Sequence, residues 1–218
     1  RLVQVGFMRR FDLAYQQMRN AIDANEIGAP LMFHSTHRNP SVPDHYTSDM
    51  AIVDTAVHDI DTARWLLNDE IVSVQVRIPK SNSRGRKDLN DPLMTIMQTA
   101  SGCLVDIETS VNIDYGYDIR GEVVGESGTL SLGERNSIIK RSAGRFSGSV
   151  CEDWRERFIA AFDEEFRGWL IAAAQGTATG PSSWDGYAAQ AVCDAGLKAL
   201  ESGEIVPVEL VEKPTLYN

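Results

Sequence analysis

The stretch 103–112, CLVDIETSVN, decides the fold, because its alternate residues differ in character. One set is largely apolar and the other largely polar. A second stretch, 72–78 (VSVQVRI), alternates in the same way, with Val72, Val74, Val76 and Ile78 as its apolar set. Successive side chains of a strand point to opposite faces, so such a strand has one buried and one solvated face. The two stretches therefore predict an antiparallel sheet covered on one side, with Cys103, Val105, Ile107, Thr109 and Val111 facing the core.

Other segments complete the sheet and its cover. Helices are expected where apolar residues recur every three to four positions between cap and stop signals. Strands flanked by helices in this order indicate the α+β class: one domain, 1–218, with an open, mostly antiparallel sheet and helices on one face. The expected helices are 12–25, 54–67, 152–174 and 183–201, and the further strands are 2–7, 31–36, 92–99, 117–124, 129–132, 137–141 and 205–210.

Composition narrows the function classes. The chain has 218 residues, 43% hydrophobic and 24% charged, as in a globular protein with a real core. Its net charge of −10 argues against nucleic acid and anionic membranes as partners, since both attract basic surfaces. The cysteines Cys103, Cys151 and Cys193 form no CxxC motif, which fits a reducing compartment, and we expect the cytoplasm.

The stretch 54–61, DTAVHDID, holds the strongest chemical signal. On a helix, residues four apart lie on one face, so Asp54 and His58 point the same way. A carboxylate beside an imidazole suits proton transfer with a small substrate. Two other interpretations stay open: Asp54 as the N-cap of this helix, and His58 as a hydrogen-bonded core histidine.

Two further polar clusters are candidates for ligand contacts. His37-Arg38-Asn39 follows a predicted strand, and Tyr115-Gly116-Tyr117 lies between two strands. Amide and phenol groups both donate and accept hydrogen bonds, as recognition of a hydroxyl-rich molecule requires. The alternatives are a turn residue for Asn39, which precedes proline, and packing roles for the tyrosines.

Several familiar sites are missing from the sequence. It contains no GxGxxG, Walker, GxSxG or HExxH motif. Four histidines lie among aspartates between residues 34 and 61, but their spacing is not compact. We therefore expect no metal site.

Four segments together resemble one family, the inositol 2-dehydrogenases of the glucose-fructose oxidoreductase/inositol dehydrogenase (Gfo/Idh/MocA) family. They are VGFMRRFD (5–12), HRNP (37–40), DTAVHDID (54–61) and YGYD (115–118). SWDGYAA (183–189) is similar to that family's late helix. The resemblance covers essentially the whole chain.

The resemblance implies a division of labour between two domains. In this family an N-terminal Rossmann domain binds NAD or NADP, and a C-terminal α+β domain forms most of the substrate pocket and the oligomer contacts. This chain resembles the C-terminal domain alone. It opens at Arg1 without Met, directly in a strand-like segment, so we expect a fragment of a longer protein that is inactive by itself. We expect a homodimer or homotetramer formed through the sheet face.

The resemblance also implies roles for individual residues. The family's catalytic lysine lies in the missing domain, and its catalytic aspartate and histidine match Asp54 and His58. His58 would accept the proton of the reacting hydroxyl, and Asp54 would orient the substrate and raise the basicity of His58. The implied substrate-binding residues are Asn39, Thr55, Tyr115, Tyr117, His37 and Arg9.

The expected activity is oxidation of myo-inositol to 2-keto-myo-inositol by an NAD-dependent polyol dehydrogenase. Three alternatives stay open: another cyclic polyol or aldose as substrate, a non-catalytic sugar-binding or assembly module, and a metal-dependent isomerase. The sequence does not distinguish NAD from NADP.

Overall fold

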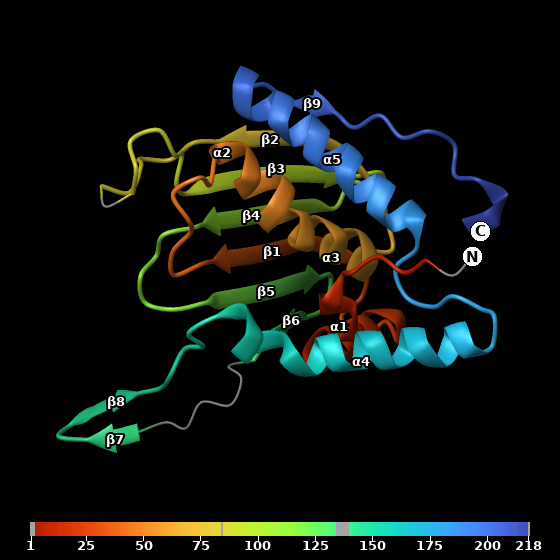
Figure 1. Ribbon diagram of the computed structural model, residues 1–218, viewed down its shortest axis with the longest axis horizontal. Helices are drawn as coiled ribbons and strands as arrows, with labels where there is room; N and C mark the ends of the chain where they lie inside the picture. Colours follow the sequence, from red (N-terminus) through yellow and green to blue (C-terminus); the bar gives the residue numbers. More distant parts are fainter. Residues whose placement is uncertain (1–2, 84, 134–139, 218) are drawn as a thin grey trace.

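The computed structural model describes residues 3–83, 85–133 and 140–217. A seven-stranded sheet has the order β6-β5-β1-β4-β3-β2-β9, and the helices lie on one of its faces (Figure 1). The strands of this sheet are β1 (Pro30–Arg38), β2 (Ile71–Arg77), β3 (Leu93–Thr99), β4 (Leu104–Ser110), β5 (Asp118–Gly125), β6 (Thr129–Ser131) and β9 (Val206–Pro207). The helices are η1 (Met8–Phe11), α1 (Leu13–Asp23), α2 (Ser48–Met50), η2 (Ala51–Ala56), α3 (Val57–Leu67), α4 (Trp154–Ala174), α5 (Ser183–Ser202) and η3 (Thr215–Tyr217).

The sheet is open and mostly antiparallel, which confirms the predicted class. Only β1 and β4 run parallel among the described pairs. In the central strand, Phe33 lies between Val105 of β4 and Val123 of β5, and all three side chains are fully buried. The core therefore lies between the middle of this sheet and the helices α3 and α5, which cross its face (Figure 1).

The alternation predicted for 103–111 is confirmed, but that for 72–78 is partly wrong. Ile71, Val74 and Val76 are buried, whereas Val72 is 41% exposed. A register shift between Ile71 and Ser73 adds a residue to one side of the β2–β3 pair, and such a bulge reverses the facing of the residues before it. Ile78 lies beyond the last residue of β2 and is exposed.

The segment expected as a helix from 54 begins earlier and changes its winding. Thr47 is the N-cap of α2, and its side chain accepts a hydrogen bond from the amide of Met50. The chain continues through η2, a π-helical segment, into α3 without a break. Asp54 therefore lies inside the helix, and its interpretation as an N-cap is wrong.

Three of the remaining sequence predictions need correction. Of the strand expected at 2–7, residue 2 lies outside the described part, and residues 3–7 form no strand. Among the described residues, the only backbone bond that ties them to a distant segment runs from the amide of Val5 to the carbonyl of Pro181. The last strand is confined to β9 (Val206–Pro207), where residue 207 is a proline that cannot donate to a ladder. The strand expected at 137–141 is described only from Lys140, where β7 (Lys140–Ser142) and β8 (Arg145–Ser147) form a separate hairpin; its residues 137–139 lie outside the described part.

The other predicted helices are confirmed to within a few residues. The side chain of Asp12 caps α1 by accepting hydrogen bonds from the amides of Ala14 and Tyr15. The same carboxylate accepts a hydrogen bond from Nη1 of Arg157, on α4, at 2.8 Å. This shared carboxylate ties α1 to α4 beside the segment that leads into the site.

Candidate active site

One pocket of about 310 Å³ gathers six of the eight residues that the sequence assigns to the site. They come from the end of β1, from the π-helical turn and the start of α3, and from the turn before β5. Two larger hollows, of about 670 and 710 Å³, contain none of the predicted residues, and another, of about 360 Å³, contains only Tyr117 of them. The pocket is lined by Gly6, Met8, His37, Asn39, Asp54, Thr55, His58, Tyr117, Trp154 and Phe162.

His58 lies in the first turn of α3 and is half-buried. Its Nδ1 is buried and has no hydrogen-bond partner among the described residues. Burial lowers the pKa of His58 to about 3, and the neighbouring Arg9 and His37 add to this effect by disfavouring a second positive charge. The imidazole is therefore neutral at pH 7 and able to accept a proton.

Asp54 is exposed at the rim of the pocket. Among the described contacts, no hydrogen bond or ion pair joins it to His58. The structure thus brings the two groups to one pocket without a direct bond between them. Its negative charge does act on neighbouring His37, whose protonated form it favours, although burial lowers the pKa of His37 overall.

The π-helical turn explains how three neighbours reach the same pocket. A π segment is wider than an α-helix and often marks a functional site. Here it carries Asp54 and Thr55 and ends directly before α3 and His58. The hydroxyl of Tyr46 donates to the carbonyl of Met50 at 2.9 Å, so Tyr46 uses its single proton there. It must accept its other hydrogen bond from Thr55 Oγ1, which leaves that oxygen able to accept from a ligand.

Asn39 is fixed by its backbone at the end of β1. Its backbone N–H donates a hydrogen bond to the carbonyl of Ser110 at 2.8 Å, and its backbone carbonyl accepts one from the N–H of Ile113 at 3.0 Å. Both bonds connect it to the strand β4 and the loop that follows. The side-chain amide is thereby held at the pocket.

Tyr117 reaches the pocket through an unusual turn. Gly116 has a φ of +143°, and a Cβ there would lie 2.8 Å from the carbonyl oxygen of Cys151. The amide of Tyr117 donates to that carbonyl at 2.7 Å. The ring of Tyr117 then stands edge-on to His37, with centroids 5.7 Å apart.

Tyr115 and Arg9 lie outside the lining of the pocket. Tyr115 is 49% exposed, and its hydroxyl contacts Asp118 and accepts a hydrogen bond from Arg38. Arg9 is buried behind the pocket, where its Nη1 donates to Asp59 Oδ1 at 2.5 Å. Neither side chain lines this pocket, and their roles in ligand binding stay predictions.

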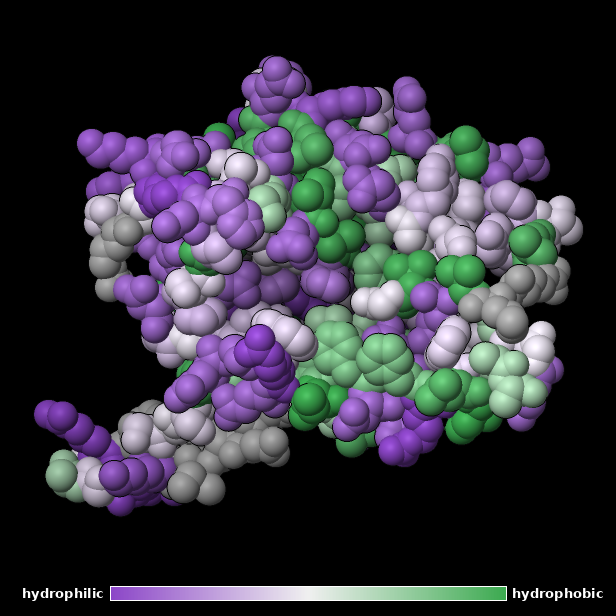
Figure 2. All heavy atoms as spheres, in the orientation of Figure 1, coloured by the Kyte–Doolittle hydropathy of each residue, from purple (hydrophilic) through white to green (hydrophobic). Residues whose placement is uncertain are grey.

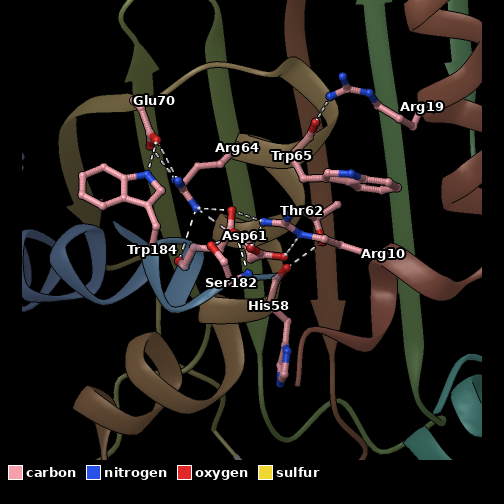
Figure 3. Close-up of polar contacts among 11 residues, drawn as sticks. Arg10, Arg19, His58, Asp61, Thr62, Arg64, Trp65, Glu70, Ser182 and Trp184 are labelled. Atoms are coloured by element: carbon pink, nitrogen blue, oxygen red, sulfur yellow. Dashed lines mark hydrogen bonds and ion pairs between the residues drawn. The ribbon is translucent and has the colours of Figure 1, made fainter. Parts of the chain in front are cut away.

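An ion-pair network anchors α3 on the side away from the pocket. Arg10 donates from Nε and Nη2 to both carboxylate oxygens of Asp61, at 2.9 and 2.5 Å, and Arg10 also reaches Asp185 at 2.8 Å. Arg64 binds both oxygens of Glu70 at 2.6 and 2.8 Å. Figure 3 shows the imidazole of His58 projecting away from this network. The network therefore holds the helix while His58 remains free of it.

The family model that matches this chain is described as "Oxidoreductase family, C-terminal alpha/beta domain" (Gfo/Idh/MocA) and covers residues 19–210. The chain belongs to this oxidoreductase family. Among curated relatives, inositol 2-dehydrogenase 3 of Saccharopolyspora erythraea is 52% identical over 217 residues, and inositol 2-dehydrogenase of Agrobacterium fabrum is 49% identical over 218 residues. All of this chain aligns with each, and it spans 64% and 65% of their respective lengths.

A solved structure agrees with this family assignment. The chain superposes on myo-inositol dehydrogenase from Lactobacillus casei, in complex with NAD(H) and myo-inositol, with a TM-score of 0.95 and 35% identity. The match covers 99% of this chain and 64% of that one. The resemblance to the Gfo/Idh/MocA family is thereby confirmed.

The pocket of this family member fits a small ligand better than a dinucleotide. Its volume of about 310 Å³ lies at the lower end of the roughly 300–1,000 Å³ that ligand pockets span. The chain also lacks a glycine-rich phosphate loop. Among the described residues, no cluster of three or more His, Cys, Asp or Glu side chains is arranged to hold a metal ion. The described helices include none with the length and apolarity needed to cross a membrane.

Besides Gly6 and Met8, which also line the pocket, sequence reasoning missed five residues at or behind this site. Trp154 and Phe162 line the pocket from α4, where apolar side chains also gather on the molecular surface (Figure 2). Tyr46 and Asp59 contact the lining residues Thr55 and His37, and Ser35 donates to Asp59. Only Asp59 had a usable signal, since it follows His58 directly inside the predicted helix.

Proposed function

We propose that this chain is the substrate-binding and oligomerisation domain of an NAD-dependent polyol dehydrogenase, which oxidises myo-inositol to 2-keto-myo-inositol. One observation carries the proposal: a neutral, half-buried imidazole and five polar side chains converge on a pocket of about 310 Å³. Relatives at 49–52% identity bear the name inositol 2-dehydrogenase, which supports the choice of substrate.

His58 is the proton acceptor in this proposal. Oxidation of a secondary alcohol breaks its O–H and C–H bonds and forms C=O. The proton passes to a ring nitrogen of His58, and NAD, when bound, would supply the acceptor for the hydride. A neutral imidazole is ready for this step, whereas a protonated one is not. The low pKa of His58 in this chain means that a bound ligand or a neighbouring domain must raise its basicity for efficient transfer.

The other lining residues would read the ring hydroxyls. Asp54 accepts from a hydroxyl at the rim and so orients the ring. Thr55 Oγ1 would accept a hydrogen bond from a ring hydroxyl, and the side-chain amide of Asn39 would donate one and accept another. Tyr117 and His37 would bind hydroxyls at the inner wall of the pocket. A polyol that leaves one buried hydrogen-bonding group of the pocket unpaired loses about 1–3 kcal/mol of binding free energy. This pattern of hydrogen bonds therefore discriminates between stereoisomers.

Arg9 and Tyr115 support the site in this proposal rather than touch the ligand. Tyr115 engages Arg38 and Asp118 and so steadies the turn that carries Tyr117. Arg9 balances the buried charge of Asp59.

The cofactor is bound mainly by a nucleotide-binding domain outside this chain. This assignment rests on the small pocket and on the absence of a phosphate loop from the sequence. We expect the 218-residue chain alone to be inactive. The cytoplasm is the proposed location.

The open face of the sheet is the proposed oligomer contact. It carries apolar residues such as Ile96 and Leu104 between polar pairs, including Arg38–Glu108 and His34–Asp106. A second copy would cover these residues and give a homodimer, or two such dimers a homotetramer.

The test is NADH formation by the full-length protein with myo-inositol, scyllo-inositol and a panel of aldoses, with this chain alone as the control. We expect turnover with myo-inositol and none with the isolated chain. Turnover with another polyol or aldose but not myo-inositol would replace the substrate. Polyol binding without any turnover would favour a non-catalytic sugar-binding module, and NADH formation by the isolated chain would contradict the division between two domains.

A further inference from the structure

A buried polar cluster lies directly behind the inner wall of the pocket. Its centre is Asp59 on α3, which is fully buried. Asp59 Oδ1 accepts hydrogen bonds from Arg9 Nη1 at 2.5 Å and from Ser35 Oγ at 2.6 Å. Asp59 Oδ2 lies 2.8 Å from Nδ1 of His37, which lines the pocket. The carboxylate touches the back of a ligand-binding residue without lining the pocket itself.

His37 Nδ1 has two neighbours, one that can only donate a hydrogen bond to it and one that can only accept a hydrogen bond from it. Arg9 Nη2 lies 3.0 Å away and can only donate, whereas the Asp59 carboxylate can only accept. Burial lowers the pKa of His37, so the ring is neutral and carries one proton. Nδ1 therefore bonds to one neighbour only, and that choice decides the state of the other ring nitrogen, Nε2.

The charges and distances favour the bond to Asp59. Burial alone would raise the pKa of Asp59, but Arg9 and His37 hold it below its ordinary value, so the group is a carboxylate. A bare nitrogen lone pair 2.8 Å from that carboxylate would be strongly repelled, whereas an N–H there makes a charge-assisted bond. Arg9 already reaches the same carboxylate through Nη1 and so does not depend on the imidazole.

We propose that Asp59 is a positioning residue that holds His37 as the Nδ1–H tautomer, so that Nε2 is a hydrogen-bond acceptor at the pocket. Nε2 lies 3.4 Å from the hydroxyl of Tyr117, which also lines the pocket. Together the two side chains can grip one ligand hydroxyl: Nε2 accepts its proton, and the phenol donates to its oxygen. An analogue without a hydroxyl at that position leaves the two side chains paired only with each other and forfeits both bonds. This role in selection rests on the proposed polyol function, whereas the tautomer does not.

The substitution Asp59→Asn tests the proposal directly, because it should invert the tautomer of His37. Arg9 and Ser35 both donate toward Oδ1, so the amide oxygen of the asparagine takes that position. The amide NH₂ then faces Nδ1 of His37 and donates to it. The tautomer must invert, and Nε2 changes from acceptor to donor.

The first readout is nitrogen-15 NMR of the histidine rings in this chain. In the wild type we expect His37 Nδ1 to be protonated and Nε2 bare, and in Asp59→Asn the reverse. Ser35→Ala is the matched control, because it removes one partner of Asp59 and keeps the carboxylate, and its His37 tautomer should match the wild type. A protonated Nε2 in the wild type overturns the proposal even if the asparagine variant does not fold.

The second readout is steady-state kinetics of the full-length protein. Asp59→Asn should raise KM for the polyol about tenfold with kcat changed by less than about threefold, since a bond to a non-reacting hydroxyl is lost. An inverted tautomer with unchanged KM would overturn the role in selection. If no polyol is turned over at all, the proposed function fails, while the NMR result still decides the tautomer.

Discussion

Single residues of the site carry a distinct pH signature. His58 and His37 both have pKa values below the ordinary 6.5 in the folded chain, to about 3 for His58. Between the folded and the unfolded pKa values of these histidines, the unfolded chain therefore binds more protons than the folded chain. The contribution of these two histidines to the free energy of unfolding is fully present above pH 6.5 and is lost as the pH falls toward their folded pKa values.

We predict that His58→Gln flattens this loss. The free energy of unfolding of the wild type should fall between pH 6.5 and 5, and the variant should fall less steeply, by about 1 kcal/mol per pH unit. Urea unfolding at several pH values measures the slope. The exposed His45 provides the control, since His45→Gln should leave the slope unchanged. An identical slope in His58→Gln would show that His58 is not held neutral by the fold.

At the scale of elements, the turn before β5 depends on a glycine. In Gly116→Ala, the new Cβ would meet the carbonyl of Cys151 at 2.8 Å, in a backbone conformation that side chains rarely adopt. We predict a loss of about 1–3 kcal/mol in the free energy of unfolding and a higher KM, because Tyr117 shifts. Gly133→Ala is the control, since nothing lies within 4 Å of its Cβ and the change should be within about 0.5 kcal/mol. Equal stability of the two variants, measured by urea unfolding, would contradict this view of the turn.

The elements also show what could be read from the sequence. Alternation along 103–111 and the cap at Asp12 follow local rules, and both are confirmed. The bulge in β2 depends on pairing with β3, and the π turn depends on how the helix packs against α5. Gly196 of α5 lies there with its Cβ position 3.1 Å from Ile52, and no local pattern announces such a contact.

The same limit applies to the site. The motif 54–61 identified the helix and both candidate catalytic groups, and six predicted residues share one pocket. The positions of Arg9 and Tyr115 depend on partners distant in sequence, namely Asp59 and Arg38. A side chain's type indicates what it can bind, whereas its partners decide whether it faces a ligand.

At the scale of the whole molecule, one face of the sheet carries none of the described helices (Figure 1). We predict that Ile96→Lys combined with Leu104→Glu weakens an oligomer formed through this face, because two charges would enter an apolar contact. Light scattering should show an oligomer for the wild type and a smaller species for the double variant. Leu170→Lys, on the exposed side of α4, is the control and should leave the mass unchanged. A wild-type mass of 24.1 kDa for this chain would contradict the oligomer.

The central claim is that His58 accepts the substrate's proton in a pocket built by this chain. Chemical rescue tests it most directly: full-length His58→Ala is assayed with NAD and myo-inositol, with and without added imidazole. We predict that kcat falls about 10²–10⁴-fold and recovers in part with neutral imidazole, which can enter the space left by the ring. Full activity of His58→Ala without imidazole would contradict the account.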